Sequence, residues 1–468
     1  MAVTTKKVPQ PPRGTLRTPE LYALAVGQVI GAGVITLVVP AMGMTGNSVW
    51  LAYLAAILVG FLYISPFLFA TSALRVSGGT YSLVSDFMGP KAGSIFAISY
   101  LSGPLYLCMF LIPCTMYVGD IIPAIGTPMG QILFPLSLSV VFLVLNWNGI
   151  DIMAKVQKLM VWLLIAALSI YIVFGISRLH LPIFDFSHAN FMPNGFVQFQ
   201  NGNLSGGFLT AVFLFYASTT GYYMVMGYGS AAYDSKRDVP RAMLLTVPTI
   251  IVLYVGVAIA TAGSTSLEEF GGSATLVTSA RNLLPAPLFY FFIICGPIMA
   301  LLSSLNSSYG FHTSVIGQAS LDGWFPRKLA AKNKHGQYGY ILILLFLISS
   351  VPIILQYNIV QLINLLQFVS LLTTLLPSTA LFMLPKKYPE AWEKARLHIP
   401  NPLYYTFCGA SVLISIVVFL KSCLSLDVKT FAVCTVMLIA ILAVALWRAK
   451  TANIEIQTSV WGEEPPEA

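Results

Sequence analysis

The segment LYALAVGQVIGAGVITLVVP, from Leu21 to Pro40, decides the fold class, because it is long enough to cross a membrane and is interrupted at its centre. A membrane-spanning helix needs roughly 20 apolar residues. Gly31 and Gly33 lie in the middle of this segment, and a glycine inside a helix costs about 1 kcal/mol relative to alanine. We therefore expect the helix to open there, which leaves backbone groups unpaired at mid-membrane.

An opened helix has a restricted set of uses inside a membrane. Lipid cannot hydrogen-bond to free backbone groups, so an opened turn must be surrounded by protein or must line a cavity that holds a polar ligand. Secondary transporters build substrate sites from discontinuous helices in this way. The alternative is that the two glycines only permit close packing against a neighbouring helix. The segment by itself favours neither interpretation.

The composition of the whole chain is that of a polytopic membrane protein. Of its 468 residues, 57% are apolar and 9% are charged, against about 25% charged residues in ordinary soluble proteins. We divide the chain into a tail (1–20), a transport core of ten helices (21–385), a further helix pair (386–447) and a second tail (448–468). Hydropathy predicts twelve spans, at 21–43, 48–73, 92–118, 129–146, 153–176, 206–229, 243–262, 287–317, 340–355, 359–384, 404–420 and 428–447.

The basic residues predict the orientation of these spans. With the N-terminus in the cytosol, all but four of the 25 lysines and arginines lie in or beside cytosolic segments. The four exceptions are Arg178, Arg281, Lys421 and Lys429. Basic residues are enriched on the cytosolic side of membrane proteins. We therefore expect a multi-pass protein of the cell membrane (inner or plasma membrane), with both termini in the cytosol.

The sequence contains no pattern typical of catalysis or metal binding. The 17 acidic residues fall in loops, tails or span ends, so no carboxylate is available at mid-membrane to hold a cation or relay a proton. The six cysteines lie in or beside apolar runs without metal-ligand spacing. We expect no enzyme activity, no catalytic residues, no metal site, no cofactor and no nucleic-acid partner. The oligomeric state is not predicted.

The sixth predicted span, GGFLTAVFLFYASTTGYYMVMGYG from Gly206 to Gly229, repeats the anomaly of the first. Residues 217–221, Ala-Ser-Thr-Thr-Gly, interrupt its apolar run at nearly the depth of the glycines in the first span. Broken helices in the first and sixth positions are what two five-helix halves of inverted topology give. The alternative is that the hydroxyl side chains only bond back to helix carbonyls. The shared depth favours a site.

Four stretches of this chain resemble a known family, the amino acid/polyamine/organocation (APC) transporters, and in particular their bacterial-type amino acid permeases. Each stretch is weak alone, but the four occur in the family's order between the expected spans. The resemblance implies an all-α fold with a five-plus-five inverted repeat of the leucine-transporter type, and transport of amino acids or their amine derivatives by alternating access. The stretches are IGAGVI (30–35), VSGGTY (76–81) with MGP (88–90), KRDVPRA (236–242), and Ser304 and Asn306 followed by DGWFP (322–326).

The expected substrate site lies at the two helix breaks. The N–H groups of a half-helix that begins near Val34 suit a carboxylate, and the carbonyls of half-helices that end near Ile30 and Tyr216 suit an ammonium group. Together they fit a zwitterionic neutral amino acid, which is the expected partner of this protein besides the lipid bilayer. The predicted binding residues are Ile30, Gly31, Ala32, Gly33, Val34, Phe215, Tyr216, Ala217, Ser218, Thr219 and Tyr222.

Two residues are candidates for ion coupling. Many family members carry a lysine inside the fifth helix, but this chain has Leu164 at that position, and Lys158 lies about 9 Å nearer the cytosolic end by helical rise. A second departure is Ser314, which replaces an arginine of the eighth helix. His312 is the only histidine inside a predicted span, and histidine titrates near neutral pH. The alternatives are a lysine that snorkels to the interface and a neutral, hydrogen-bonded histidine.

Three classes of function compete. The first is an amino acid exchanger, uniporter or proton symporter. The second is a sodium-coupled symporter, with an amine/amino acid antiporter as a further variant. The third is a non-transporting membrane sensor or partner subunit, which would show no substrate flux. For sodium, hydroxyl ligands beside the carbonyls of the first helix would come from Ser303, Ser304, Ser307 and Ser308.

Overall fold

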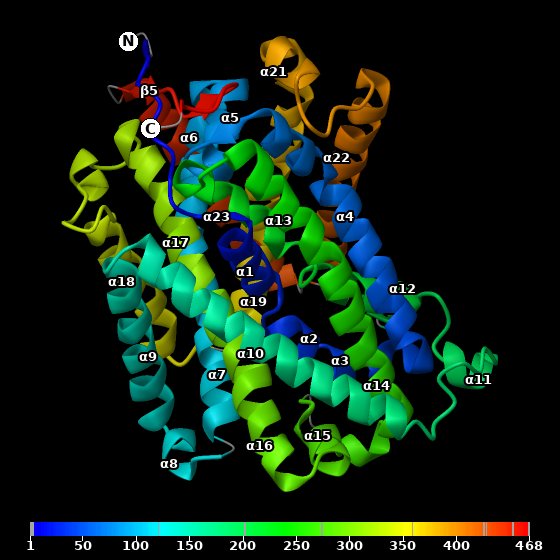
Figure 1. Cartoon of the computed structure of the whole chain (residues 1–468). Coiled ribbons are helices and arrows are strands. Elements are labelled where there is room, and N and C mark those ends of the chain that lie inside the picture. Colours follow the sequence, from blue (N-terminus) through cyan, green and yellow to red (C-terminus); the bar gives the residue numbers. More distant parts are fainter. Residues whose placement is uncertain are drawn as a thin grey trace.

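The computed structural model describes residues 4–119, 121–200, 203–272, 275–357, 359–424, 426, 428–451 and 454–466. In this part of the chain the structure is predominantly helical, and the longer helices cross the molecule between two opposite ends (Figure 1). The helices up to residue 191 are α1 (Thr18–Val29), α2 (Ala32–Thr36), α3 (Val38–Thr45), η1 (Gly46–Ser48), α4 (Val49–Ala73), α5 (Gly79–Met88), α6 (Pro90–Ser99), η2 (Tyr100–Leu107), α7 (Cys108–Gly119), α8 (Pro123–Gly126), α9 (Gly130–Trp147), α10 (Ile150–Ser177) and α11 (His188–Phe191).

The later helices begin with the sixth predicted span. They are α12 (Phe208–Tyr216), η3 (Gly221–Ala231), α13 (Ser235–Ile250), η4 (Ile251–Val255), α14 (Gly256–Ser264), η5 (Glu268–Phe270), α15 (Val277–Leu283), α16 (Ala286–Ile293), η6 (Ile294–Ile298), α17 (Met299–Leu321), η7 (Arg327–Ala330), α18 (Gly339–Ile354), α19 (Ile359–Ala380), η8 (Leu381–Met383), α20 (Leu384–Lys387), α21 (Pro389–Glu393), α22 (Asn401–Leu424) and α23 (Val428–Thr451).

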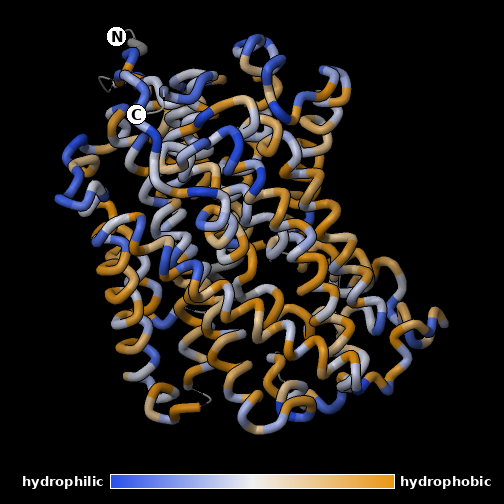
Figure 2. The backbone as a smooth tube through the Cα atoms, viewed as in Figure 1, coloured by the Kyte–Doolittle hydropathy of each residue, from blue (hydrophilic) through white to orange (hydrophobic). Residues whose placement is uncertain are grey.

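These helices are those of a polytopic membrane protein. Gly339–Ile354 is a shorter apolar helix at the ninth predicted position, and α19 occupies the tenth. Hydrophilic residues gather at the end of the molecule that carries both termini, whereas hydrophobic residues dominate the helices below (Figure 2). Among the described residues, ten stretches are long and apolar enough to cross a membrane: Thr18–Thr36, Val38–Ala73, Pro90–Gly119, Gly130–Trp147, Ile150–Ser177, Phe208–Ala231, Ser235–Ser264, Ala286–Leu321, Asn401–Leu424 and Val428–Thr451.

Two of the crossing helices contain a widened, π-helical turn. The stretch that begins with α13 passes through η4, and the stretch that begins with α16 passes through η6. Pro297 lies inside η6, and a proline has no N–H with which to complete a regular helical turn. Such turns often occur at functional sites, because they redirect the side chains around them. In η4 the redirected side chains include that of Tyr254.

Short strands join segments that are far apart in the sequence. β3 (Gln198–Gln200) and β4 (Asn203–Gly206) form an antiparallel ribbon between α11 and α12. β1 (Thr4–Lys6) pairs in parallel with β5 (Glu455–Gln457), and β2 (Arg75–Val76) pairs antiparallel with β6 (Val460–Trp461). Both termini therefore lie at the same end of the molecule (Figure 1). We call this end, which carries β1, β2, β5 and β6, the tail face.

Candidate functional site

The first predicted break is present and lies slightly earlier than expected. α1 ends at Val29, and Ile30 and Gly31 have non-helical backbone angles. The helix begins again at Ala32 rather than near Val34, so Gly33 is inside α2. A helix can accept Gly33 as long as its hydrogen bonds continue, and the Leu37 N–H donates to the Gly33 carbonyl at 3.1 Å. Of Ala32, only the backbone belongs to the described part of the chain.

Both glycines of this break lie where a neighbouring helix approaches the backbone closely. A Cβ atom added to Gly31 would lie 2.8 Å from Ser304 Oγ. A Cβ atom added to Gly33 would collide with the Cβ atom of Ser218, in the second break. The helix thus opens, and its neighbours also pack against the opened turn; a substrate site at this turn stays a prediction.

The second break separates α12 from η3. α12 ends at Tyr216, and η3 begins at Gly221. The Ser218 hydroxyl donates to the Phe215 carbonyl at 2.8 Å, and the Thr219 hydroxyl donates to the Tyr216 carbonyl at 2.9 Å. These hydroxyls bond back to the helix, as the alternative interpretation proposed, but the helix is interrupted all the same. The same two carbonyls also accept the Ser218 and Thr219 N–H groups, at 2.9 and 3.0 Å, so each has two donors at the end of α12.

One tyrosine connects the two breaks. The Tyr254 hydroxyl, from η4, lies 2.6 Å from the carbonyl oxygen of Val29 and 3.2 Å from that of Ser218. Tyr53 lies beside it, with its hydroxyl 3.2 Å from Ser218 Oγ and its ring stacked on Phe215 at a centroid distance of 3.7 Å. Sequence reasoning missed both tyrosines, because each is a single polar group within an apolar helix and no local pattern distinguishes it.

The predicted binding residues gather at this junction. Ile30, Val34 and Phe215 are fully buried, Tyr216 and Tyr222 are nearly so, and Ala217 is exposed. The Thr219 hydroxyl also contacts the Ala56 carbonyl of α4 at 3.2 Å. The structure thus brings residues from two distant segments into one region, in which aromatic faces lie beside backbone carbonyls. Which of them contact a substrate remains a prediction.

The serines proposed as sodium ligands lie beside the end of α1. Ser304 Oγ is 2.6 Å from the Gly27 carbonyl oxygen and 3.4 Å from that of Ile30. Ser303 Oγ is 3.0 Å from the Ala300 carbonyl oxygen and 3.5 Å from that of Gly27. Two hydroxyls of α17 and three carbonyls therefore form one cluster of five neutral oxygen atoms.

The remaining two serines are bonded one turn further along α17. Ser307 Oγ lies 3.3 Å from the Leu24 carbonyl oxygen, while Ser308 Oγ lies 3.2 Å from the side chain of Gln28. Ser308 thus contacts an amide side chain rather than the backbone of the opened helix, which makes it a suitable control for the cluster.

The two coupling candidates occupy different surroundings. Lys158 pairs with Glu20 at 2.8 Å, and its side chain is 40% exposed. Leu164, at the family's lysine position, is fully buried. His312 is buried in α17, and its Nδ1 atom lies 2.7 Å from the Tyr100 hydroxyl of η2. Ser314, two residues further on, donates to the Gly227 carbonyl at 2.8 Å. A coupling role for Lys158 or His312 remains a prediction.

Comparison with known proteins gives matches over much of the chain. Large neutral amino acids transporter small subunit 2 of Homo sapiens is 22% identical over 407 residues, which cover 84% of this chain and 73% of that protein. A protein of unassigned function from Methanocaldococcus jannaschii is 19% identical over 330 residues, or 68% of this chain and 72% of that protein. Solute carrier family 12 member 1 of Mus musculus is 23% identical over 248 residues, which cover 51% of this chain but 22% of that protein.

A family model extends further than these pairwise matches. The model described as amino acid permease matches residues 16–457, which include both helix breaks, the serines of α17 and the strand β5. This agrees with the resemblance found in the sequence. The chain therefore belongs to the amino acid permease family, among the APC transporters.

Proposed function

We propose that this protein is a secondary transporter of neutral amino acids that works by alternating access, as an exchanger, uniporter or proton symporter. Its substrate site lies between the breaks at Ile30–Gly31 and Ala217–Thr220. The observation that carries this proposal is the Tyr254 hydroxyl, which lies within hydrogen-bond distance of a carbonyl from each break. One hydroxyl within reach of both breaks supports a single site built from the two.

The polarity of the opened helices favours a zwitterionic substrate. The first turn of α2 has N–H groups without acceptors inside the helix, and these suit a carboxylate. The carbonyl of Val29, at the end of α1, and that of Ser218, in the second break, suit an ammonium group. This group would replace the Tyr254 hydroxyl as the donor to both carbonyls. None of the proposed site residues is acidic, which disfavours polyamines and the amine/amino acid antiporter.

The proposal includes an arrangement in the membrane. Twelve spans in two inverted halves of five, followed by a helix pair, would place the two broken helices at corresponding positions. The tail face would be cytosolic, because the basic clusters of residues 6–17, 236–241, 327–334 and 386–396 all lie in the loops and tails that the predicted orientation puts inside.

Two measurements on the purified full-length protein test the proposal. The first is thermal stability in the presence of each amino acid, because a ligand that binds the folded state raises the apparent stability. We expect a shift for one group of neutral amino acids. The second is uptake of a mixture of labelled amino acids into proteoliposomes. A protein that gains stability from an amino acid and shows no flux would be the sensor or partner subunit instead, and absence of both would refute the proposed site.

A sodium-coupled symporter is the second candidate, and the oxygen cluster at the end of α1 favours it. The cluster consists of the Gly27, Ile30 and Ala300 carbonyls and the Ser303 and Ser304 hydroxyls. Hard cations prefer neutral and anionic oxygen ligands, and the carbonyls of unwound helices commonly supply them in transporters. The cluster is therefore chemically suited to Na⁺.

Sodium dependence separates the two candidates. We expect uptake that does not change when choline replaces Na⁺ if the first candidate is correct. For the second, uptake would require Na⁺, and Ser304→Ala would raise the Na⁺ concentration needed for half-maximal uptake by about tenfold, equivalent to about 1.4 kcal/mol. Ser308→Ala is the matched control, because Ser308 lies on the same helix and contacts the Gln28 side chain instead.

A further inference from the structure

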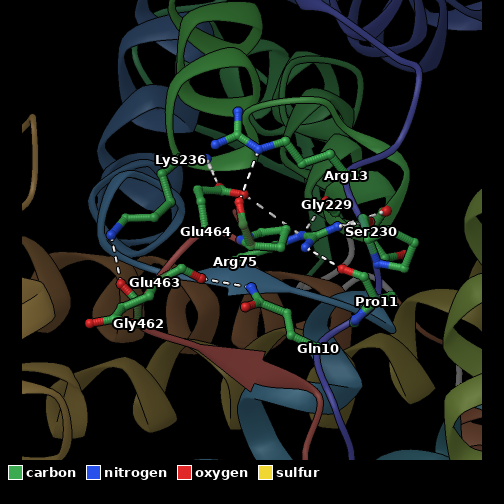
Figure 3. A network of polar contacts seen from close by, with 12 residues as sticks. Gln10, Pro11, Arg13, Arg75, Gly229, Ser230, Lys236, Gly462, Glu463 and Glu464 are labelled. Carbon is green, nitrogen blue, oxygen red and sulfur yellow. Dashed lines mark hydrogen bonds and ion pairs between the residues drawn. The ribbon is translucent and has the colours of Figure 1, made fainter. Parts of the chain in front are cut away.

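The last described residues of the chain are bound along the tail face (Figure 3). β6 pairs with β2, with Val460 opposite Val76, and the Ser77 N–H donates to the Ser459 carbonyl at 2.8 Å. Ile454 and Val460 are buried, at 3% and 2% exposure. Residues 454–465 are therefore bound to the tail face by buried apolar side chains and by strand pairing. We call this segment the C-terminal strap.

One end of the strap is tied to the ends of α4 and η3 and to the start of α13. Arg75, which is fully buried, donates to the Ser230 carbonyl at 3.0 Å and to the Pro11 carbonyl at 2.8 Å, and its Nε atom lies 3.9 Å from Glu464. The Lys236 N–H donates to the Glu464 carboxylate at 2.8 Å. Figure 3 shows these groups converging from both tails and from the helices between them.

The other end of the strap is tied to the loop after α17. The Gln457 N–H donates to the Asp322 carboxylate at 3.1 Å, and the Glu455 N–H donates to the Asp322 carbonyl at 3.2 Å. Tyr81 of α5 donates to the same carboxylate at 2.6 Å. Arg327 forms an ion pair with Glu455 at 3.2 Å. The strap thus bridges the α4, η3 and α13 side of the tail face to the α17 and α5 side.

The strap spans two groups of helices that are packed against each other. In one group α1, η3 and α13 pack on one another and α4 packs on α13 and η3; in the other, α17 packs on α7, α9 and α18. The two groups meet where α17 packs on α1 and η3. In transporters with inverted repeats, alternating access is largely a rocking of one such group against the other. Opening on the tail face would separate α17 from η3, and the Ser314 hydroxyl of α17 at present donates to the Gly227 carbonyl of η3.

We propose that the C-terminal strap is a clasp that holds the tail face closed and must leave β2 before the transport pathway can open on that side. This inference rests on the proposed transport function, because it concerns the regulation of the same pathway. The strap is attached by the β2–β6 and β1–β5 strand pairs, by backbone hydrogen bonds to Ser77 and Asp322, and by side chains at its two ends. It can therefore detach without unfolding a transmembrane helix.

The first test measures closure without measuring transport. In a protein whose six native cysteines are replaced by alanine, Ser314→Cys reports whether the region between α17 and η3 is open to water. We expect a hydrophilic maleimide to label this cysteine at least about threefold faster when the chain ends at Thr451 than when the strap is present. Lys334→Cys, which is exposed, is the control and should be labelled at equal rates in both proteins. Equal rates at Ser314→Cys would overturn the clasp.

The second test keeps the strap and fixes it in place. Val76 and Val460 are strand partners, so their Cα atoms lie at a separation that a disulfide can span. In the cysteine-free protein, we expect oxidation of the Val76→Cys/Val460→Cys pair to stop amino acid uptake into proteoliposomes and reduction to restore it. Each single variant is its control and should transport before and after oxidation. If the cross-linked protein takes up amino acid as fast as the reduced protein does, the proposal is refuted.

The two tests also separate the clasp from the proposed function. If the reduced protein transports no amino acid, the transport function fails, and the labelling of Ser314→Cys still decides whether the strap closes the tail face. If the reduced protein transports and cross-linking has no effect, only the clasp fails. A truncated protein that does not fold is recognised by its loss of monodispersity, and the cross-linking result then decides alone.

Discussion

The hydroxyl oxygen of Tyr254 lies 2.6 Å from the carbonyl oxygen of Val29, the last residue of α1. Tyr254 lies in a π-helical turn more than 200 residues later in the chain. From there its hydroxyl also reaches the Ser218 carbonyl of the second break. The Val29 carbonyl also accepts the Gly31 N–H at 3.0 Å, and the Tyr254 hydroxyl is its second donor.

We expect Tyr254→Phe to reduce transport while the protein remains folded. Loss of one buried hydrogen bond costs about 0.5–1.5 kcal/mol, and the Val29 carbonyl keeps the Gly31 N–H as a donor at 3.0 Å. The measurement is uptake together with thermal stability. Tyr22→Phe is the matched control, since its hydroxyl bonds Thr249 at 2.8 Å across the same pair of helices, away from the breaks. Equal effects of the two variants would argue against a special role for Tyr254.

Gly33→Leu should abolish substrate binding and leave the protein inserted in the membrane. Any side chain at Gly33 collides with Ser218, so the two breaks must move apart. The expected result is the loss of ligand-induced thermal stabilisation. Gly409→Leu in α22 is the control, because an added Cβ there meets no atom within 4 Å. Normal binding by the Gly33 variant would remove the first break from the site.

The side chains of the second break should select the substrate. Ser218 and Thr219 lie in the turn itself, and Tyr222 follows it at the start of η3, 2% exposed. We expect alanine at all three positions to change the ranking of neutral amino acids in a competition uptake assay. An unchanged ranking would mean that the substrate side chain lies elsewhere.

His312 should contribute to the pH dependence of transport. It is a titratable ring inside a predicted span, and its Nδ1 atom is hydrogen-bonded to Tyr100 of a neighbouring helix. An ionisable residue inside a membrane is a candidate for proton coupling. We expect His312→Gln to change the profile of uptake against pH in the range where histidine titrates. If the profiles of the variant and the parent coincide, the histidine has a structural role.

The stability of the tail face should depend on pH through Asp322. Burial raises the pKa of the Asp322 carboxyl to about 6, although Tyr81 and the Gln457 N–H donate hydrogen bonds to it. Since this pKa is above the value of an unfolded aspartate, the folded protein binds the proton more tightly, and this contribution to stability grows as the pH falls through about 6.

The measurement is the melting temperature of the parent and of Asp322→Asn at pH 7.5 and pH 5.5. We expect acidification to stabilise the parent relative to the variant, which has no carboxyl group to protonate. A constant difference between the two proteins across this range would show that Asp322 keeps an ordinary pKa.

The sequence by itself determined the class of the protein and the positions of the helix breaks. Long apolar runs and few charges predict a polytopic membrane protein, because burial in lipid depends on composition along a single segment. The breaks near Gly31 and at residues 217–220 were predicted for a similarly local reason, since glycines and hydroxyl residues weaken the helix in which they stand. The family motifs could be recognised for the same reason, because each is a short local stretch of sequence.

The tertiary structure decided where α2 begins, which donors complete the broken helices, and where the C-terminal strap lies. The helix restarts at Ala32, and Gly33 there packs against Ser218, a residue that the first span alone does not contain. Tyr254 and Glu464 each find a partner hundreds of residues away, at Val29 and Arg75. Such contacts depend on how complete helices pack. The sequence around a single hydroxyl or carboxylate therefore does not predict which distant group it will contact.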